Sequence, residues 1–172
     1  MSRQLLLEAQ LSNKELFVLV SLFTGDETAR TMIVSASICT MVTPPFPDTE
    51  LGRRLGEFRA WLDSFMEGAE LSVSEDPFNK PPDTMLARVS PVEEDFWSIR
   101  VTEPEESPGI RGFGGFHKQD EFVALTFDYR EDIGDFSAEV DAVREAWTRF
   151  FGVERPFHGD ELDEYLTNYI VV

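Results

Sequence analysis

Dense apolar runs dominate the first 42 residues of the chain. The run QLLLEAQL, a polar break at residues 12–14 and the run ELFVLVSLF together predict a hairpin over the first 24 residues. The second run is apolar at nearly every position, as is typical of a strand covered on both faces. Residues 29–42, ARTMIVSASICTMV, are rich in β-branched and small residues and show no helical stripe, so a third strand is predicted there.

A helix with one apolar face is predicted after the breaker TPPFP at residues 43–47. Asp48 or Thr49 can cap its first turn, and Gly68 ends it. Its apolar side chains recur at spacings of three and four residues, at Leu51, Leu55, Phe58, Leu62 and Phe65. The other face is interpreted as solvated, with a patch for phosphate or an acidic partner as the alternative; it carries Arg53, Arg54, Glu57 and Arg59.

The centre of the chain alternates strands with breakers. Residues 74–84 contain three prolines and predict a long loop, which is the only candidate internal boundary. Short strands are predicted in MLARVS and FWSIRVT, followed by a loop at EPEESP. Residues 109–132 then predict a strand, a turn at HKQD and a second strand.

The glycines of this second hairpin do not match a phosphate-binding loop. A dinucleotide fingerprint needs G-x-G-x-x-G at the start of a helix, whereas Gly112, Gly114 and Gly115 lack the last glycine and precede a strand. Glycines within a strand mark bends or the close approach of a large ring. With Phe113 and Phe116 beside them, we expect rings to pack over bare backbone. A stacking platform for RNA is the alternative, but such modules sit in a basic field.

Two helices are predicted after this hairpin. Ser137 is predicted to cap the first, which ends at Gly152 and buries Val140, Val143, Trp147, Phe150 and Phe151. A last short helix is predicted from Asp160, with buried side chains at Leu162, Leu166 and either Tyr169 or Ile170. The order of elements predicts an α+β fold: a mostly antiparallel sheet of about six to seven strands, two main helices and a short C-terminal helix. Residues 1–172 are expected to form a single domain.

The formal net charge of −18 is concentrated in the second part of the chain. Residues 1–66 carry a net charge of −2, and residues 67–172 carry −16. Such a field repels nucleic acid and anionic membranes, and it attracts basic protein surfaces. Solubility alone is the simpler explanation of the same charge.

The single cysteine and the apolar runs bear on the compartment. Cys39 has no partner for an internal disulfide, so we expect the protein in a reducing compartment. Cys39 also stands among apolar residues, so we expect its side chain to be buried. The first apolar run is too short and too interrupted for a signal peptide, and none is long enough to span a membrane. The prediction is a cytoplasmic protein.

The run GFGGFHKQDEFVALTFDYRED, followed by EAWTRFFG and PFHGDELDEYL, resembles a family of short bacterial and phage-encoded proteins, largely without an assigned reaction. The resemblance covers residues 109–166 and implies no catalytic residue. The positions shared with this family can be explained by structural roles in a hairpin, in the core or as a polar anchor: Gly115, Phe116, Asp120, Phe122, Val123, Arg130 and Trp147. The same strand-turn-strand also resembles RelE-type ribonuclease toxins, whose chemistry relies on a concentration of basic groups that this acidic chain does not show.

Motifs for catalysis or metal binding are missing from the sequence. His117 and His158 are the two histidines, and neither has the ligand spacing of a metal site, so both are expected in loops. The acid runs Glu93-Glu94-Asp95 and Glu105-Glu106 stand beside breakers and are interpreted as solvated loops. There is no Gly-x-Ser-x-Gly elbow and no Walker loop. No cofactor and no metal are predicted.

Two hypotheses about function follow. The first is an acidic protein-binding module, in the form of a phage-encoded inhibitor that docks on a basic, nucleic-acid-binding surface of a host protein. Its predicted partner-binding residues are Asp160, Glu161, Asp163 and Glu164, which lack the spacing and the glycine of a calcium loop. The second is a small intracellular enzyme with a carboxylate or His117 site beside the sheet. Neither direct nucleic-acid binding nor membrane binding is expected, and homo-oligomer formation stays open.

Overall fold

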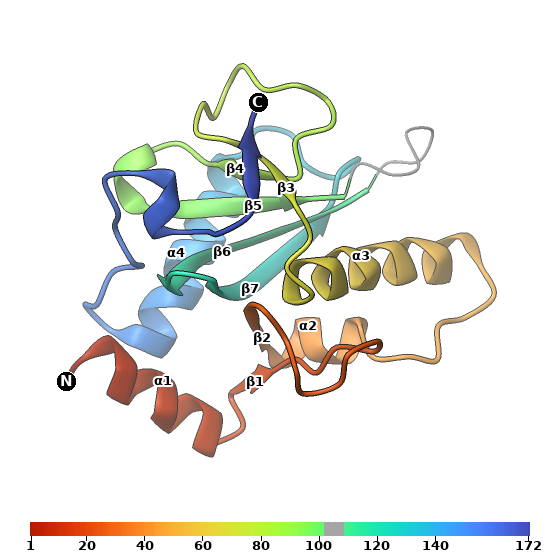
Figure 1. Cartoon of the computed structure of the whole chain (residues 1–172), viewed down its shortest axis with the longest axis horizontal. Helices are drawn as coiled ribbons and strands as arrows, with labels where there is room; N and C mark the ends of the chain where they lie inside the picture. The colour runs from red at the N-terminus through yellow and green to blue at the C-terminus, as the bar shows by residue number, and fades with distance from the viewer. Residues whose placement is uncertain (102–108) are drawn as a thin grey trace.

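The computed structural model of the chain describes residues 1–101 and 109–172 and is built on one β-sheet flanked by helices (Figure 1). The described part contains eight strands: β1 (Leu16–Val18), β2 (Thr31–Ser35), β3 (Leu71–Ser74), β4 (Leu86–Arg88), β5 (Phe96–Arg100), β6 (Ile110–Lys118), β7 (Glu121–Tyr129) and β8 (Tyr169–Val171). It also contains four α-helices: α1 (Arg3–Ser12), α2 (Ala36–Met41), α3 (Glu50–Met66) and α4 (Ser137–Phe151). Two 3-10 turns are η1 (Val92–Glu94) and η2 (Leu162–Glu164). The predicted α+β class is confirmed, while the predicted loop EPEESP with Glu105-Glu106 lies outside the described residues.

The sheet is mixed, and among the described residues it has more strands than predicted. Its strand order is β1-β2-β7-β6-β5-β4-β3-β8. The central strands from β7 through β6 and β5 to β4 are antiparallel, as is the β1–β2 pair. The β2–β7, β3–β4 and β3–β8 pairs are parallel. The edge strands β1 and β8 have three residues each, too few for an alternating pattern to predict their pairing.

The amino-terminal region corrects the sequence prediction. The run ELFVLVSLF forms a strand only at Leu16–Val18, and this strand lies at the sheet edge instead of being covered on both faces, since Val18 is 52% exposed. Two helices also replace predicted strands. Residues 3–12 form α1 instead of a strand, because the run is rich in good helix formers and Ser2 Oγ accepts a hydrogen bond from the backbone N–H of Leu5 (3.5 Å). The predicted strand at 29–42 ends early, since Ser35 Oγ accepts a hydrogen bond from the N–H of Ile38 (3.4 Å) and begins α2. In both cases a serine cap starts a helix within an apolar run.

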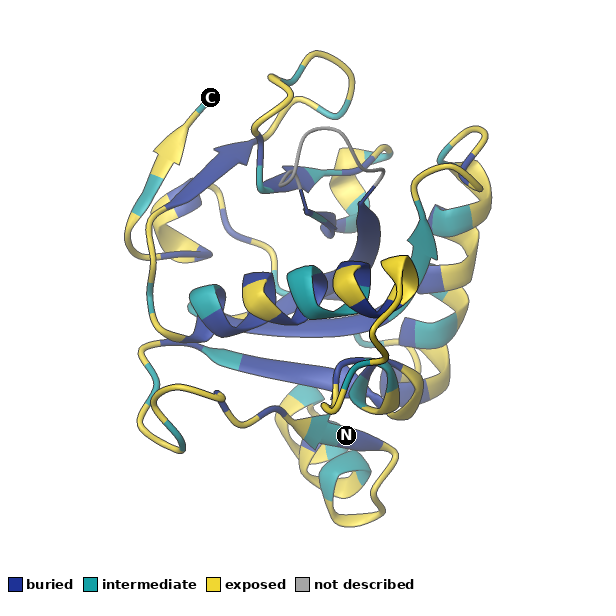
Figure 2. Ribbon diagram, turned by 90° about the vertical axis from the view of Figure 1, so that its right-hand side faces the viewer, coloured by how far each residue is buried: buried dark blue, intermediate teal, exposed yellow. Residues whose placement is uncertain are grey.

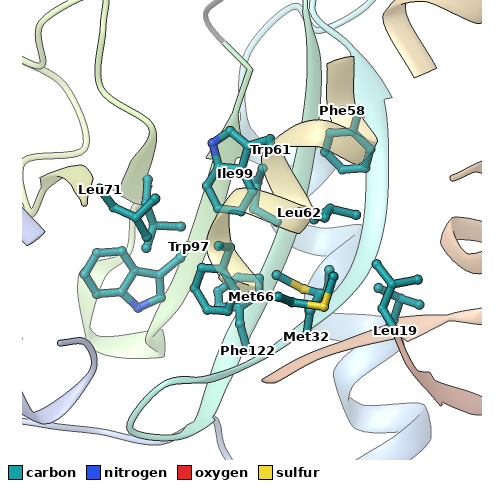
Figure 3. Packing of buried hydrophobic residues seen from close by; sticks show 14 of the residues in the cluster. Leu19, Met32, Phe58, Trp61, Leu62, Met66, Leu71, Trp97, Ile99 and Phe122 are labelled. Atoms are coloured by element: carbon teal, nitrogen blue, oxygen red, sulfur yellow. The ribbon is translucent and has the colours of Figure 1, made fainter. Parts of the chain in front are cut away.

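Helices cover both faces of the sheet. On one face, Phe58 and Leu62 of α3 pack in a cluster with Trp97, Ile99 and Phe122 of the sheet (Figure 3). On the other face, α1 and α4 pack in a second cluster. The central strands are buried between these layers, while the helices expose their outer sides (Figure 2).

The glycines of β6 lie where large side chains approach the backbone from both layers. A Cβ added at Gly112 would lie 3.0 Å from Cζ of Phe58. A Cβ added at Gly115 would lie 2.8 Å from Cβ of Pro156 and 3.2 Å from Cζ3 of Trp147. The expectation that rings pack over bare backbone is confirmed.

Helix α3 confirms the predicted element. Thr49 Oγ1 accepts a hydrogen bond from the N–H of Gly52 (3.1 Å), and Gly68 follows the helix with φ of 80°. Leu51, in the first turn, is 46% exposed. The remaining predicted positions pack on the core, and three are fully buried: Phe58, Leu62 and Phe65.

Two arginines of α3 are buried, which corrects the prediction of a solvated face. Arg59 Nε donates to Asp63 Oδ2 (3.0 Å), and its Nη1 donates to the carbonyl of Val42 (3.2 Å). Arg54 forms a bidentate pair with Glu131 beyond β7 (2.6 and 2.8 Å). A buried guanidinium needs such partners to offset its lost hydration. These two side chains therefore tie α3 to neighbouring segments.

Helix α4 has the predicted buried face: Val140, Val143, Trp147, Phe150 and Phe151. Its start differs by one residue, because Phe136 is the N-cap and Asp135 Oδ1 accepts the N–H of Ser137 (2.8 Å). Gly152 ends it as predicted, with φ of 61°.

The predicted last helix is wrong. Only a 3-10 turn, η2, forms, and Tyr169–Val171 becomes β8 in parallel register with β3. Leu162 and Leu166 are buried as predicted, whereas Ile170 is 46% exposed. Pairing with β3 satisfies the backbone hydrogen bonds of this short segment. Because β3 is distant in the sequence, local sequence patterns cannot predict this pairing.

Candidate functional site

The four predicted partner-binding residues lie together on the segment that joins α4 to β8. All four are exposed: Asp160, Glu161, Asp163 and Glu164. The apolar residues interleaved with them are at most 5% exposed: Leu162, Tyr165 and Leu166. The segment is therefore anchored through its apolar side chains and holds its acidic side chains outward.

Two of these acids also stabilise the turn. Glu164 Oε2 accepts hydrogen bonds from the N–H groups of Asp160 (2.6 Å) and Glu161 (3.1 Å). The side chain of Glu161 accepts the N–H of Glu164 in return, which completes a capping box. Asp160 differs, because its side chain is 94% exposed and reaches only His158 Nε2, at 3.9 Å.

The acidic surface extends to the end of β3. The hydroxyl of Tyr169 donates a hydrogen bond to Asp163 Oδ1 (2.7 Å). This hydrogen bond raises the pKa of Tyr169, with further contributions from burial and from the charges of Asp163, Glu75 and Glu161. Glu75 directly follows β3, so two segments contribute to one surface. We call this surface the acidic face and define it as Glu75, Asp160, Glu161, Asp163 and Glu164.

A buried aspartate fastens the segment to the sheet. Asp95, between η1 and β5, has a left-handed φ of 58° and is 5% exposed. Its Oδ1 accepts hydrogen bonds from Arg88 Nη2 (2.8 Å) and from the hydroxyl of Tyr165 (2.7 Å). Burial is the main cause that raises the pKa of Tyr165 to about 12. The interpretation of Asp95 as a solvated loop residue is therefore wrong, because it is the centre of a buried network.

Asp95 also orients an exposed histidine. Its Oδ2 lies 2.9 Å from His158 Nδ1, and the His158 side chain is 64% exposed. An imidazole held in this way by a carboxylate can act as a general acid or base. Among residues 1–101 and 109–172, no hydroxyl or thiol is hydrogen-bonded to its Nε2. The pair therefore offers an oriented imidazole without a nucleophile beside it.

His117 is not in a loop, which corrects the prediction. It lies near the end of β6, its side chain is 4% exposed, and its Nδ1 is 2.6 Å from Glu121 Oε1 across the hairpin. Burial alone would raise the pKa of Glu121, but the hydrogen bonds and charges of His117 and Lys118 together outweigh burial and lower it. A substrate cannot reach this imidazole in the described conformation. The geometry therefore gives no support to a site at His117.

Asp120 anchors the hairpin turn between β6 and β7. Asp120 has φ of 58°, and its Oδ2 accepts a hydrogen bond from Thr167 Oγ1 (2.8 Å). Its Oδ1 lies 3.4 Å from Nε of Arg30, whose side chain is fully buried. These contacts clamp the hairpin to the segment that carries the acidic face, so Asp120 has a structural role.

Neither a metal-binding cluster nor a membrane-spanning helix occurs within residues 1–101 and 109–172. No group of three or more histidine, cysteine, aspartate or glutamate side chains is placed to hold a metal ion there. Nor does any helix in those ranges have the length and apolar character to cross a membrane. Cys39 is unpaired and partly exposed, not buried as predicted.

No family model, no curated protein and no solved structure matches the chain. The predicted likeness to bacterial and phage-encoded proteins stays a prediction. What the chain does is therefore inferred from its own residues.

Proposed function

We propose that the protein is a binding module whose acidic face docks on a basic surface of another protein. One observation carries the proposal: carboxylates point outward from a turn whose interleaved apolar side chains are buried. A simple solubilising surface does not need its acids gathered on an anchored turn. The charge of −16 over residues 67–172 adds a field of the same sign around this face.

The acidic face is preorganised for binding. The capping box of Glu161 and Glu164 fixes the turn, and the Asp95 network fixes its base through Tyr165. Ordering a loop on binding costs free energy, and a loop that is already ordered avoids that cost. The acids can therefore meet a matching set of lysines or arginines without rearrangement.

A protein surface that binds nucleic acid is the partner class that fits this face. Such surfaces carry clustered lysine and arginine side chains that neutralise phosphates. Carboxylates on an anchored turn carry negative charge, as the phosphates of nucleic acid do. The module would therefore occupy the nucleic-acid-binding site of the partner protein and inhibit that protein. The resemblance to phage-encoded proteins supports an inhibitor of a host protein.

Two matched variants test the docking surface. Asp160→Lys with Glu75→Lys alters the acidic face while leaving the capping acids in place. Asp26→Lys with Glu27→Lys makes the same change of net charge at two exposed acids near β1. Binding of a fluorescent decalysine peptide is measured by anisotropy at about 50 and about 300 mM salt, where the Debye length is shorter.

The expected result is a loss of affinity of about tenfold or more for the first variant at low salt, and a much smaller loss for the second. Binding by the wild type should weaken at the higher salt. Equal losses in the two variants would mean that net charge alone attracts the peptide, and the proposed docking face would be wrong.

An enzyme is the second candidate, and the orientation of His158 by Asp95 is the observation that favours it. The docking function predicts that His158→Asn leaves decalysine binding unchanged, because the imidazole adds no negative charge. If His158→Asn abolished binding while circular dichroism showed an intact fold, the oriented imidazole would be part of the working site.

A further inference from the structure

Strand β8 forms one open edge of the sheet. It is the last strand in the order β1-β2-β7-β6-β5-β4-β3-β8, and it pairs with β3. Tyr169 is partly exposed, and Ile170 and Val171 are 46% and 65% exposed. Figure 2 shows this strand, which leads to the C label, on the outside of the molecule. An open edge is a template on which another extended segment can pair.

The backbone of β8 directs alternate residues away from the sheet. The carbonyl of Asn168 accepts a hydrogen bond from β3 (3.3 Å), and the N–H of Val172 donates to β3 (3.0 Å). In a parallel ladder, alternate residues of a strand face the same neighbour. The N–H and C=O groups of Tyr169 and Val171 therefore point outward, and none of them is hydrogen-bonded to another residue in the described part of the chain.

The acidic face brackets this edge. At its start, the hydroxyl of Tyr169 donates a hydrogen bond to Asp163 Oδ1 (2.7 Å). At its other end, Val171 is in register with Val73, and Glu75 follows two residues later along β3. An extended segment that pairs with β8 therefore runs between carboxylates of the acidic face.

A hollow of about 540 Å³ lies beside the same edge. Tyr169 and Val171 line it from β8, and Asp163 lines it from the segment before β8. The side chains of Tyr169 and Val171 leave one face of the strand, because they are two residues apart. Side chains opposite each other on paired strands are about 5 Å apart. A long basic side chain opposite Tyr169 therefore lies over the hollow, within reach of Asp163.

We propose that β8 is the docking edge for the partner: an extended segment rich in lysine or arginine adds to the sheet beside β8, and its basic side chains pair with the acidic face. This inference rests on the proposed docking function and specifies which element of the partner binds. Backbone hydrogen bonds to Tyr169 and Val171 fix the position of the segment, and the carboxylates select its charge.

A second copy of the chain fits this edge less well. Pairing two β8 strands would bring two acidic faces together, and like charges across an interface oppose association. The other open edge, β1, is also close to exposed acids, Asp26 and Glu27. Charge complementarity therefore favours a basic segment over either edge of a second copy.

The test uses the full chain and a short peptide in which lysine alternates with threonine, a residue that favours extended structure. Amide hydrogen exchange, measured by NMR, follows the N–H groups of Tyr169 and Val171. Both should exchange rapidly in the free protein and at least about tenfold more slowly in the complex, because the added strand accepts their hydrogen bonds. Protection of both groups in the free protein, rising with its concentration, would show that a second copy occupies the edge and would overturn the inference.

A second probe separates strand addition from attraction by charge. The same peptide with a methyl group on every backbone nitrogen keeps its lysines but has no backbone donors, so it should bind about tenfold more weakly or worse. If both peptides bind equally and Tyr169 and Val171 stay unprotected, strand addition is wrong while docking through charge stands. If neither peptide nor decalysine binds, docking on the acidic face is itself wrong, and strand addition falls with it.

Matched proline variants test the edge from the side of the protein. Val171→Pro removes an outward N–H and leaves the hydrogen bonds to β3 in place, and edge strands tolerate such prolines. Val18→Pro makes the same change on β1, where the N–H of Leu19 donates to Met32 of β2 (2.8 Å) and that of Val18 points outward. Val171→Pro should weaken peptide binding by about fivefold or more, and Val18→Pro should not. Melting temperatures check that both variants are folded, and equal peptide affinities for the two would overturn the inference.

Discussion

At the scale of single residues, Trp147 shows how packing and hydrogen bonding combine. Its ring stacks on Phe151 at 4.4 Å between centroids and lies over the bare backbone of Gly115. Its Nε1 donates to the carbonyl of Glu154 (2.8 Å), so the segment after α4 is bound to the same side chain. One residue therefore joins α4, β6 and the start of the segment that carries the acidic face.

Trp147→Ala should lower the free energy of unfolding by about 3–5 kcal/mol, as truncation of a buried aromatic side chain usually does. Urea denaturation measures it. Phe23→Ala is the matched control, because Phe23 is 75% exposed and its truncation should change stability by less than about 0.5 kcal/mol. An unchanged midpoint for Trp147→Ala would show that the indole is not part of the core.

The buried Tyr165 predicts an alkaline weakening of the fold. Its pKa is raised from 10.0 to about 12, mainly by burial, so between these values the unfolded chain loses a proton that the folded chain keeps. Stability from this group is present below pH 10 and is lost as the pH rises toward 12. The free energy of unfolding should therefore fall more steeply with pH in the wild type than in Tyr165→Phe over this range. Parallel slopes would mean that Tyr165 titrates normally.

At the scale of elements, the sequence predicted the helices and strands that have a clear apolar period. α3, α4 and the β6–β7 hairpin have a clear apolar period, and the structure has all of them. α1 was missed because LLLE fits a strand as well as a helix until the cap at Ser2 is recognised. β8 was missed because its three residues are determined by distant pairing with β3.

The same reasoning applies to the candidate site. The acidic residues of the turn were found because acids before a short apolar run are visible in the sequence. Asp95 and His117 were misread, because Asp95 meets Tyr165, which is 70 positions further along the chain, and His117 meets Glu121 across a hairpin. Side-chain networks between distant elements leave no local spacing to detect.

Gly115→Ala tests the close packing of β6 against the α4 layer. The new Cβ would lie 2.8 Å from Cβ of Pro156, so the variant should lose about 1–3 kcal/mol of stability through overpacking. Gly134→Ala is the matched control, because nothing lies within 4 Å of its Cβ position, and it should be neutral or slightly stabilising. Thermal unfolding of both variants gives the comparison, and equal melting temperatures would contradict the packing described for β6.

At the scale of the whole molecule, charge is unevenly distributed in two senses. The acidic face gathers carboxylates on an anchored turn, and residues 67–172 carry a net charge of −16, against −2 for residues 1–66. The net charge of −18 produces a negative field around the molecule, which attracts basic molecules and repels anionic ones. This field has the sign that the proposed docking on a basic protein surface requires.

Nucleic-acid polymers should not bind. With a net charge of −18, the phosphate backbone opposes association instead of driving it, so no complex with RNA or duplex DNA is expected at physiological salt. A gel shift at micromolar protein would refute this.

The most direct test of docking through the acidic face is the rate of association with decalysine, measured by stopped flow at about 50 mM salt, where exposed charges steer encounter. The Asp160→Lys, Glu75→Lys variant is compared with the Asp26→Lys, Glu27→Lys variant, which has the same net charge. Docking through the acidic face predicts that the first associates several-fold more slowly than the second. Equal rates for the two variants would contradict it.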